Sequence, residues 1–235
     1  MDGRLRLPGP PGTAPIGLAV VPAAGETGPV DDAERRSAAG MAPWRAAEFL
    51  RGRGLLRGLT AEVLHLAPEA VGFRVEPGGR PRLRGHPAGV SVSHTDRHTA
   101  AAVWPDGAVG VDVMEPPDEL DARLVRRCCG ERAERMLAEP GAAAGFARVW
   151  AVQEACVKAV GLGLGGLPWR IPVDPGARRG RWRGVRWELM DTGLPCVLAV
   201  AVQETPRRSV ADLAVLVQHP ARSGLHPAAG PAAGN

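Results

Sequence analysis

The chain has 235 residues, 45% of them hydrophobic and 23% charged, which are proportions typical of a soluble globular protein. No run approaches the roughly 20 apolar residues of a membrane span, and no apolar core of signal-peptide length follows the start, so we expect a cytoplasmic protein without a membrane segment. The net charge of +4 favours anionic partners, namely nucleic acid, phosphorylated small molecules or an acidic protein. The four cysteines have neither metal-ligand spacing nor the pattern of a disulfide framework, which excludes a small disulfide-stabilised fold.

The first part of the chain predicts strands that alternate with helices. Residues 44–59 predict an amphipathic helix, with apolar residues on one face and arginines on the others. Pro105-Asp106-Gly107 predicts a hairpin turn between two strands, and 77–81 predicts a tight turn. A helix is expected after Asp31 and Asp32, and strands are expected at 16–21, 73–76, 89–94, 99–104 and 109–113.

The second part repeats this order. Pro116-Pro117 ends a strand, and Asp118 is expected to cap the following helix. Helices are expected at 119–127, 131–137 and 145–160, and strands at 171–173, 181–190, 196–203 and 212–217. We therefore predict an α+β fold of two similar lobes, with residues 1–108 as the N-terminal lobe, 109–220 as the C-terminal lobe, and 221–235 as a disordered tail.

Lys158 is the only lysine among the 29 lysine and arginine residues of the chain. A composition rich in glycine and proline indicates a bias that replaces lysine by arginine wherever either serves. An ammonium is a compact charge, whereas a guanidinium binds as a planar fork. Trp150, Glu154 and Lys158 would share one helix face at spacings of four. An exposed Glu–Lys pair is the ordinary interpretation of such spacing; the alternative is a functional acid and ammonium.

A second carboxylate, Asp112, stands near the end of the buried-looking strand Gly110-Val111-Asp112-Val113. A hard cation such as Mg²⁺ takes one or two carboxylates, with phosphate oxygens and water as its other ligands. Asp112 and Glu154, brought together from different parts of the chain, would satisfy this requirement. A turn or capping aspartate is the simpler alternative for Asp112.

Several short motifs, in their order and spacing, carry a resemblance to a known family. They are Glu48-Phe49 with Gly52-Arg53, Gly79-Arg80-Pro81, Ser91-Val92-Ser93-His94, Gly110-Val111-Asp112-Val113, and Phe146 through Trp150-x-x-x-Glu154-Ala155-x-x-Lys158. From 31 to 202 the chain resembles the Sfp-type 4'-phosphopantetheinyl transferases. The resemblance implies two pseudo-twofold related α/β lobes with coenzyme A in the cleft between them.

The resemblance also implies roles for individual residues. Asp112 would be the main Mg²⁺ ligand. Glu154 would be a second ligand and the base, with Glu115 as an additional candidate ligand, and Lys158 would stabilise the transferring phosphate. Contacts to the phosphates and adenosine of coenzyme A would come from Arg45, Arg53, Gly79, Arg80, Pro81, Ser93 and His94.

The implied reaction moves phosphopantetheine from coenzyme A to a serine of an acidic acyl or peptidyl carrier domain, in polyketide or non-ribosomal peptide synthases, and releases adenosine 3',5'-bisphosphate. The lobes forming one site suggest a monomer. Two positions depart from the family pattern: Met114 stands where many relatives have Glu, and Gln153 where the usual motif has Lys. Gln153 thereby puts coenzyme A affinity in doubt.

Two alternatives remain open at this stage. The segment 178–187 could be a basic hairpin whose interleaved tryptophans stack on nucleic-acid bases, although buried tryptophans under solvated arginines are more common. The chain could also be a relative that binds coenzyme A without catalysis.

Overall fold

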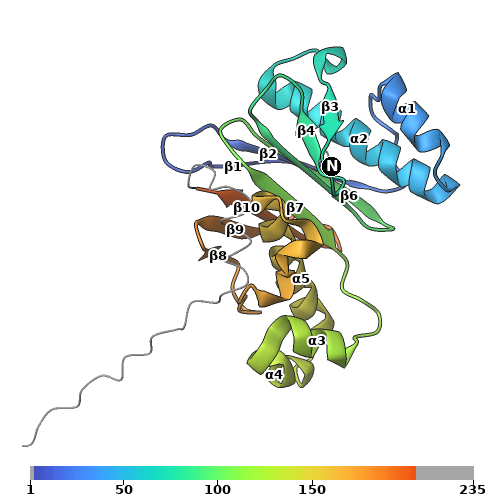
Figure 1. Ribbon diagram of the computed structural model, residues 1–235. Helices are drawn as coiled ribbons and strands as arrows, with labels where there is room; N and C mark the ends of the chain where they lie inside the picture. The colour runs from blue at the N-terminus through green and yellow to red at the C-terminus, as the bar shows by residue number, and fades with distance from the viewer. Residues whose placement is uncertain (1–2, 205–235) are drawn as a thin grey trace, which may run out of the picture.

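The computed structural model describes residues 3–204, so the strand expected at 212–217 and the tail expected at 221–235 lie outside the described residues. Two four-stranded antiparallel sheets and a short β-hairpin form the β part of the fold. Helices pack on both sheets (Figure 1). The mixed α+β class is as predicted.

The first sheet has the strand order β1-β2-β6-β5. Its strands are β1 (Arg4–Leu7), β2 (Ile16–Pro22), β6 (His98–Trp104) and β5 (Gly89–His94). Strand β1 was not expected from the sequence. The long helix α2 (Pro43–Leu64) packs on β6, β5 and β2, and α1 (Asp32–Ala39) packs on α2. The hairpin of β3 (Phe73–Val75) and β4 (Pro81–Leu83) lies beside this sheet.

The second sheet has the strand order β7-β10-β9-β8. Its strands are β7 (Val109–Met114), β10 (Val197–Gln203), β9 (Val185–Met190) and β8 (Arg179–Trp182). Helix α5 (Ala142–Val160) covers it, and α3 (Ala122–Cys129) and α4 (Ala133–Leu137) pack against α5 (Figure 1). Short 3₁₀ turns lie at Pro68–Ala70, Gly130–Arg132, Gly163–Gly166 and Pro168–Arg170.

The two halves share one connection pattern. In each, a strand (β2 or β7) leads through a long helix to two later strands (β5 and β6, or β9 and β10), and the later of these two lies between the first strand and the other one. This gives β2-β6-β5 in the first half and β7-β10-β9 in the second.

Alternation along the strands explains how the sheets stack. Successive side chains of a strand point to opposite faces. Leu18 and Val20 belong to a core shared with strands of the second sheet, whereas Ala19 belongs to the core beneath α2. The two sheets therefore pack face to face, and each presents its other face to its own helix. Strands β5 and β7 come together at the seam, where the Val111 amide donates to Ser91 Oγ at 3.1 Å.

Several expectations about local structure were wrong. Pro105-Asp106-Gly107 does not form a hairpin, because β6 and β7 belong to different sheets. Asp121, not Asp118, caps α3 by accepting from the Arg123 amide at 2.8 Å. Residues 181–190 form no single strand: Arg183 and Gly184 take positive φ and join β8 to β9 as a hairpin.

The arginines of α2 also differ from the amphipathic expectation. Arg53 and Arg57 are buried rather than solvent-facing. Arg57 donates to Asp31 and Glu34, both at 2.7 Å, so acids from α1 and its cap neutralise a cation inside the N-terminal half. Residues 171–173 form no strand either; they follow a 3₁₀ turn.

Candidate active site

A cavity of about 650 Å³ lies between elements of the two halves. Helix α2, the β3–β4 hairpin and strand β5 supply its wall from the first half, and α5 with the turn after it supplies the wall from the second. Most of the residues singled out in the sequence line this cavity: Arg45, Arg53, Gly79, Arg80, Pro81, His94, Glu154 and Lys158.

Asp112, Ser93 and Lys158 form a hydrogen-bonded triad at the seam of the halves. The Lys158 ammonium donates to Asp112 Oδ1 at 2.5 Å and to Ser93 Oγ at 3.0 Å. The Ser93 hydroxyl donates to the same Asp112 oxygen at 2.6 Å. Asp112 and Ser93 are buried, whereas the Lys158 side chain keeps 26% of its exposure. Ser93 therefore supports Asp112 and Lys158 instead of lining the cavity.

Gly110 allows β7 and α5 to approach closely enough for this triad. A Cβ at Gly110 would lie 2.0 Å from the Ala155 carbonyl oxygen and 2.4 Å from the Ala159 amide nitrogen. Only glycine fits so close a backbone contact. Because Asp112 follows two residues later on the same strand face, the approach brings its carboxylate to the helix face that carries Glu154 and Lys158.

Glu154 lies one turn before Lys158 on α5 and lines the cavity. Its Oε1 is buried, and no hydrogen-bond partner for it exists among residues 3–204. Burial raises the pKa of the Glu154 carboxyl above its ordinary value of 4.5, and the Asp112 charge raises it further while Lys158 lowers it. A carboxyl with a raised pKa and a free oxygen is suited to accept a proton or a metal ion.

Asp112 and Glu154 could hold a divalent cation if a bound substrate supplied further oxygen ligands. Within the described part of the chain, no group of three or more His, Cys, Asp or Glu side chains could hold a metal alone. Asp112 and Glu154 provide two neighbouring carboxylates, and the Asp112 bonds above use Oδ1 only. Mg²⁺ is commonly held by one or two carboxylates together with substrate phosphates and water.

Arg53 provides a buried cationic group in the wall of the cavity. Its guanidinium stacks over the rings of Phe49 and Phe73 at 5.1 and 5.7 Å, and it is 6% exposed. Its buried Nη1 has no hydrogen-bond partner among residues 3–204. Burial lowers the pKa of Arg53, but a guanidinium stays charged in proteins. Such an N–H donor is suited to an anionic oxygen.

Arg45 and His94 converge on an acid that sequence reasoning left without a role. Glu48 Oε1 is 3.0 Å from His94 Nε2, and Glu48 Oε2 accepts from Arg45. Burial lowers the pKa of His94, and Arg45 and Lys158 lower it further, against the opposing charges of Glu48 and Asp112. The spacing of Arg45 and Glu48, three residues apart on one helix, was the available signal for this contact.

Arg80 connects the β3–β4 hairpin with the C-terminal end of α5. Its guanidinium donates to the Ala159 carbonyl at 3.3 Å and lies beside Gly161. Gly79 takes a positive φ of 87° in the turn before it, and Pro81 begins β4. The hairpin is thereby tied across the cavity to the second half.

Three other positions from the sequence lie away from the cavity. Glu115 Oε1 accepts from Thr95 at 2.6 Å and lies 2.5 Å from His98 Nδ1, and Glu115 does not line the cavity. Met114 packs against the core beneath α5. Gln153 is fully buried and donates to the carbonyls of Cys128 and Ile171, both at 2.9 Å. Its amide thus joins α5 to α3 and to the chain after α5, and it does not face the cavity.

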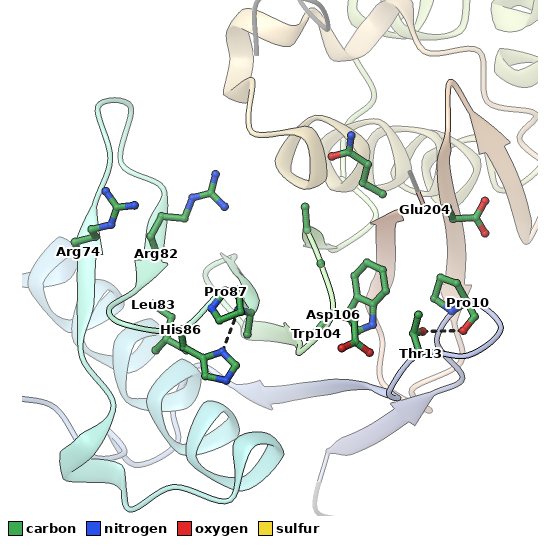
Figure 2. Close-up of a pocket in the computed structure, with 14 residues that line it drawn as sticks. Pro10, Thr13, Arg74, Arg82, Leu83, His86, Pro87, Trp104, Asp106 and Glu204 are labelled. Carbon is green, nitrogen blue, oxygen red and sulfur yellow. Dashed lines mark hydrogen bonds between the residues drawn. The ribbon is translucent and has the colours of Figure 1, made fainter. Parts of the chain in front are cut away.

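A second hollow, of about 560 Å³, lies beside the chain that connects the two sheets (Figure 2). None of the predicted site residues lines it. Three of its polar groups already have partners: Asp106 accepts from the Ala14 amide at 2.5 Å, Arg82 donates to Glu76, and Glu204 pairs with Arg181. The chemistry of the site therefore belongs to the cavity that Glu154 and Lys158 line.

The basic hairpin at 178–187 has packed indoles rather than a stacking surface. Trp187 is buried at 4% exposure, and Trp182 packs against the same core. Arg181 and Arg186 pair with Glu204. This arrangement is the common one of solvated arginines over buried tryptophans.

Two further observations limit the chemistry. The four cysteines are free, and burial raises the pKa of Cys128 to about 12 and also raises that of Cys156, so these thiols are poor nucleophiles. Across residues 3–204, no helix combines the length and apolar character that crossing a membrane requires.

Residues 108–186 match the family model of the 4'-phosphopantetheinyl transferase superfamily. The matched segment runs from just before β7, through α5 and β8, into β9, and it contains Asp112, Glu154 and Lys158. The arginines of α2, the β3–β4 hairpin and His94 precede it. A search of the curated proteins found no match to the chain.

Proposed function

We propose that this protein is an Sfp-type 4'-phosphopantetheinyl transferase, which transfers the phosphopantetheine arm of coenzyme A to a serine hydroxyl of an apo carrier domain. One observation carries the proposal: Glu154 and Lys158 of α5 line a cavity whose opposite wall bears arginines and a histidine, and Lys158 is bonded to the buried Asp112 of β7. The match of 108–186 to the transferase superfamily supports the same reaction class. The shared strand order of the two halves fits a fold of two related lobes with the site between them.

Each charged group has a task in this reaction. Glu154 takes the proton of the acceptor serine, whose oxygen then attacks the phosphorus that bears the pantetheine arm. A new P–O ester bond forms, and the bond to the bridging oxygen of the pyrophosphate breaks. The ammonium of Lys158 stabilises the negative charge that develops on the transferring phosphate and on the leaving group, adenosine 3',5'-bisphosphate.

Asp112 and Glu154 would hold Mg²⁺, with pyrophosphate oxygens and water as its remaining ligands. The metal would supply charge neutralisation at the pyrophosphate. Ser93 fixes the Asp112 carboxylate through its hydroxyl, so the acid is oriented before substrate arrives.

The anionic part of coenzyme A would lie against the first half. Arg53 offers an unpaired N–H to a phosphate, and Arg45 and His94 lie along the same wall. Arg80, with Gly79 and Pro81, would contact the nucleotide from the hairpin while its guanidinium holds the end of α5. Among acceptors, acidic carrier domains of polyketide or non-ribosomal peptide synthases suit a protein with a pI near 9.3.

The direct test is to incubate the protein with Mg²⁺, coenzyme A and an apo carrier domain, and to measure the intact mass of the carrier. We expect a gain equal to one phosphopantetheine arm, dependent on Mg²⁺ and absent for a carrier whose acceptor serine is replaced by alanine. An unmodified carrier together with measurable coenzyme A binding would identify a non-catalytic relative. Salt-sensitive binding to RNA without coenzyme A binding would support the nucleic-acid alternative.

A further inference from the structure

Two arginines of α2 lie one helical turn apart and share a phenyl ring, but they differ in their acid partners. The guanidinium groups of Arg53 and Arg57 lie 5.7 and 5.6 Å from the centre of the Phe73 ring. Arg57 pairs with Asp31 and Glu34, both at 2.7 Å. Within the described part of the chain Arg53 forms no ion pair. Arg53 lines the cavity and Arg57 does not, so the two acids pair with the arginine that lies away from the cavity.

The bonds of Glu34 hold its carboxylate against Arg57. Its Oε2 accepts from the Asp31 amide at 3.0 Å and from Arg57 at 2.7 Å, so the capping box of α1 and Arg57 engage the same oxygen. Its Oε1 is buried and has no hydrogen-bond partner among residues 3–204, and the same is true of Arg53 Nη1. A carboxylate and a guanidinium that each keep a free buried atom would form a charge-assisted bond if they met.

Glu34 already acts on Arg53 through its charge. Burial lowers the pKa of Arg53, and among the surrounding charges that of Glu34 opposes this lowering most. Glu34 is only 8% exposed, so water screens its charge weakly. If its carboxylate came into direct contact with Arg53, it would compete with a ligand anion for the same guanidinium.

We propose that Arg57 is a positioning residue for the anion site: it binds Glu34, so that this acid does not pair with Arg53 and the charge of Arg53 stays available to an anion in the cavity. Arg57 acts through Glu34 and Arg53 and does not touch the ligand. The inference rests on the proposed function in one respect, that the anion is coenzyme A.

Calorimetric titration of matched variants with coenzyme A tests the inference. In Arg57→Gln we expect Glu34 to pair with Arg53, and affinity for coenzyme A to fall about tenfold. In the Glu34→Gln, Arg57→Gln double variant the competing charge is gone, and we expect affinity within about threefold of wild type. Glu34→Gln alone should bind at least as tightly as wild type, although the loss of a buried ion pair lowers its stability. Arg35→Gln, which removes an exposed cation of α1, should change affinity by less than about twofold.

An Arg53→Gln background separates positioning from a merely structural effect. There, Arg57→Gln should cost little further affinity, because Arg57 acts through Arg53. A general disturbance of α2 would weaken binding in that background as well, and such a loss would overturn the inference. Wild-type affinity in Arg57→Gln would overturn it too.

The double variant decides the question if Arg57→Gln does not fold, because it leaves no buried Glu34 charge without its cation. Affinity close to that of wild type supports the inference, and a loss of about tenfold contradicts it. Transfer to an apo carrier is measured separately by intact mass. A carrier that stays unmodified while Glu34→Gln restores coenzyme A binding in Arg57→Gln would refute the transferase proposal alone. An active transferase whose affinity for coenzyme A does not depend on Arg57 would refute the inference alone.

Discussion

Lys158 lies at a position where a compact ammonium group fits and a planar guanidinium does not. Its ammonium contacts Asp112 Oδ1 and Ser93 Oγ, two acceptors that are themselves hydrogen-bonded to each other. A guanidinium is larger and places its donors in a plane, so it cannot satisfy both acceptors without moving Asp112. This geometry gives a physical reason why position 158 keeps a lysine in a chain that otherwise uses only arginine among its lysine and arginine residues.

For Lys158→Arg we expect kcat to fall by about 100-fold, because the charge is retained but displaced from the developing phosphate charge. The dissociation constant for coenzyme A should change little. Transfer rates measured by intact mass under saturating substrate give the comparison. An arginine variant with the wild-type rate would show that charge alone suffices.

The Ser93→Ala substitution distinguishes two interpretations of the role of Ser93. If it supports Asp112 and Lys158, as its bonds indicate, Ser93→Ala should lower kcat about tenfold and leave the KM for coenzyme A nearly unchanged. If it contacts coenzyme A, as the family resemblance implied, KM should rise instead. Steady-state kinetics with coenzyme A as the varied substrate distinguish the two.

The raised pKa of Glu154 predicts a pH dependence of protein stability that can be measured without metal. Because its pKa is raised in the folded protein, its contribution to stability is present below the pKa of the unfolded chain and is lost as pH rises through the folded pKa. In buffer with a chelator, the stability of Glu154→Gln minus that of wild type should therefore increase as pH rises from about 4.5.

Denaturant unfolding of both proteins across this pH range checks the sign. A difference that stays constant, or that decreases with pH, would mean that the Glu154 carboxyl is not disfavoured in its ionised form. The same variant should still bind coenzyme A but transfer its arm very slowly.

At the scale of elements, the contact between β7 and α5 determines where the acids meet. Gly110 packs directly on the backbone of Ala155 and Lys158–Ala159, with no room for a methyl group. The contact therefore positions Asp112 relative to Glu154 and Lys158 as well as stabilising the second half.

For Gly110→Ala we expect the free energy of unfolding to fall by about 2 to 3 kcal/mol, since backbone atoms must move apart. Activity should fall further than stability explains, because Asp112 moves with its strand. Gly58→Ala is the matched control: a Cβ there meets nothing within 4 Å, and alanine favours a helix interior. Denaturant titration of the two variants provides the comparison, and equal stabilities would refute the packing argument.

Helices and strands followed from local patterns, whereas their pairing did not. The periodicity over α5 and the alternation along β5, β7 and β10 predicted these elements nearly to their ends. The hairpin expected at 105–107 was wrong because β7 finds its partner in β10, some 80 residues later, and nothing local encodes that choice. Likewise, Arg57 is buried because acids of α1 and its cap meet it, a contact that the sequence of α2 alone does not contain.

In the candidate site too, the sequence predicted individual residues but not the contacts between elements. The motifs identified Asp112, Glu154 and Lys158, and the fold brings them together. They did not reveal that Ser93 is hydrogen-bonded to Lys158, or that Gln153 is buried and donates a hydrogen bond from α5 to α3. Gln153 therefore gives no structural reason to expect weakened binding of coenzyme A. The contacts of Glu48 with His94 and of Arg80 with Ala159 join different elements, so spacing along the chain does not predict them.

At the scale of the whole molecule, both halves contribute residues to one cavity. The second half supplies Glu154 and Lys158, with Asp112 bonded to Lys158, and the first half supplies the cations of α2 together with His94. The Arg80 contact with the end of α5 and the Ser91 contact with β7 hold the two sides together.

The central claim is that Asp112 and Glu154 share one divalent ion with the pyrophosphate of coenzyme A. Phosphorus NMR of bound coenzyme A, with protein in excess and Mn²⁺ in place of Mg²⁺, measures this directly. We predict stronger paramagnetic broadening of the pyrophosphate signals than of the 3'-phosphate signal, and loss of that difference in the Asp112→Asn, Glu154→Gln double variant. Identical broadening in the two proteins, with coenzyme A bound to both, would contradict the claim.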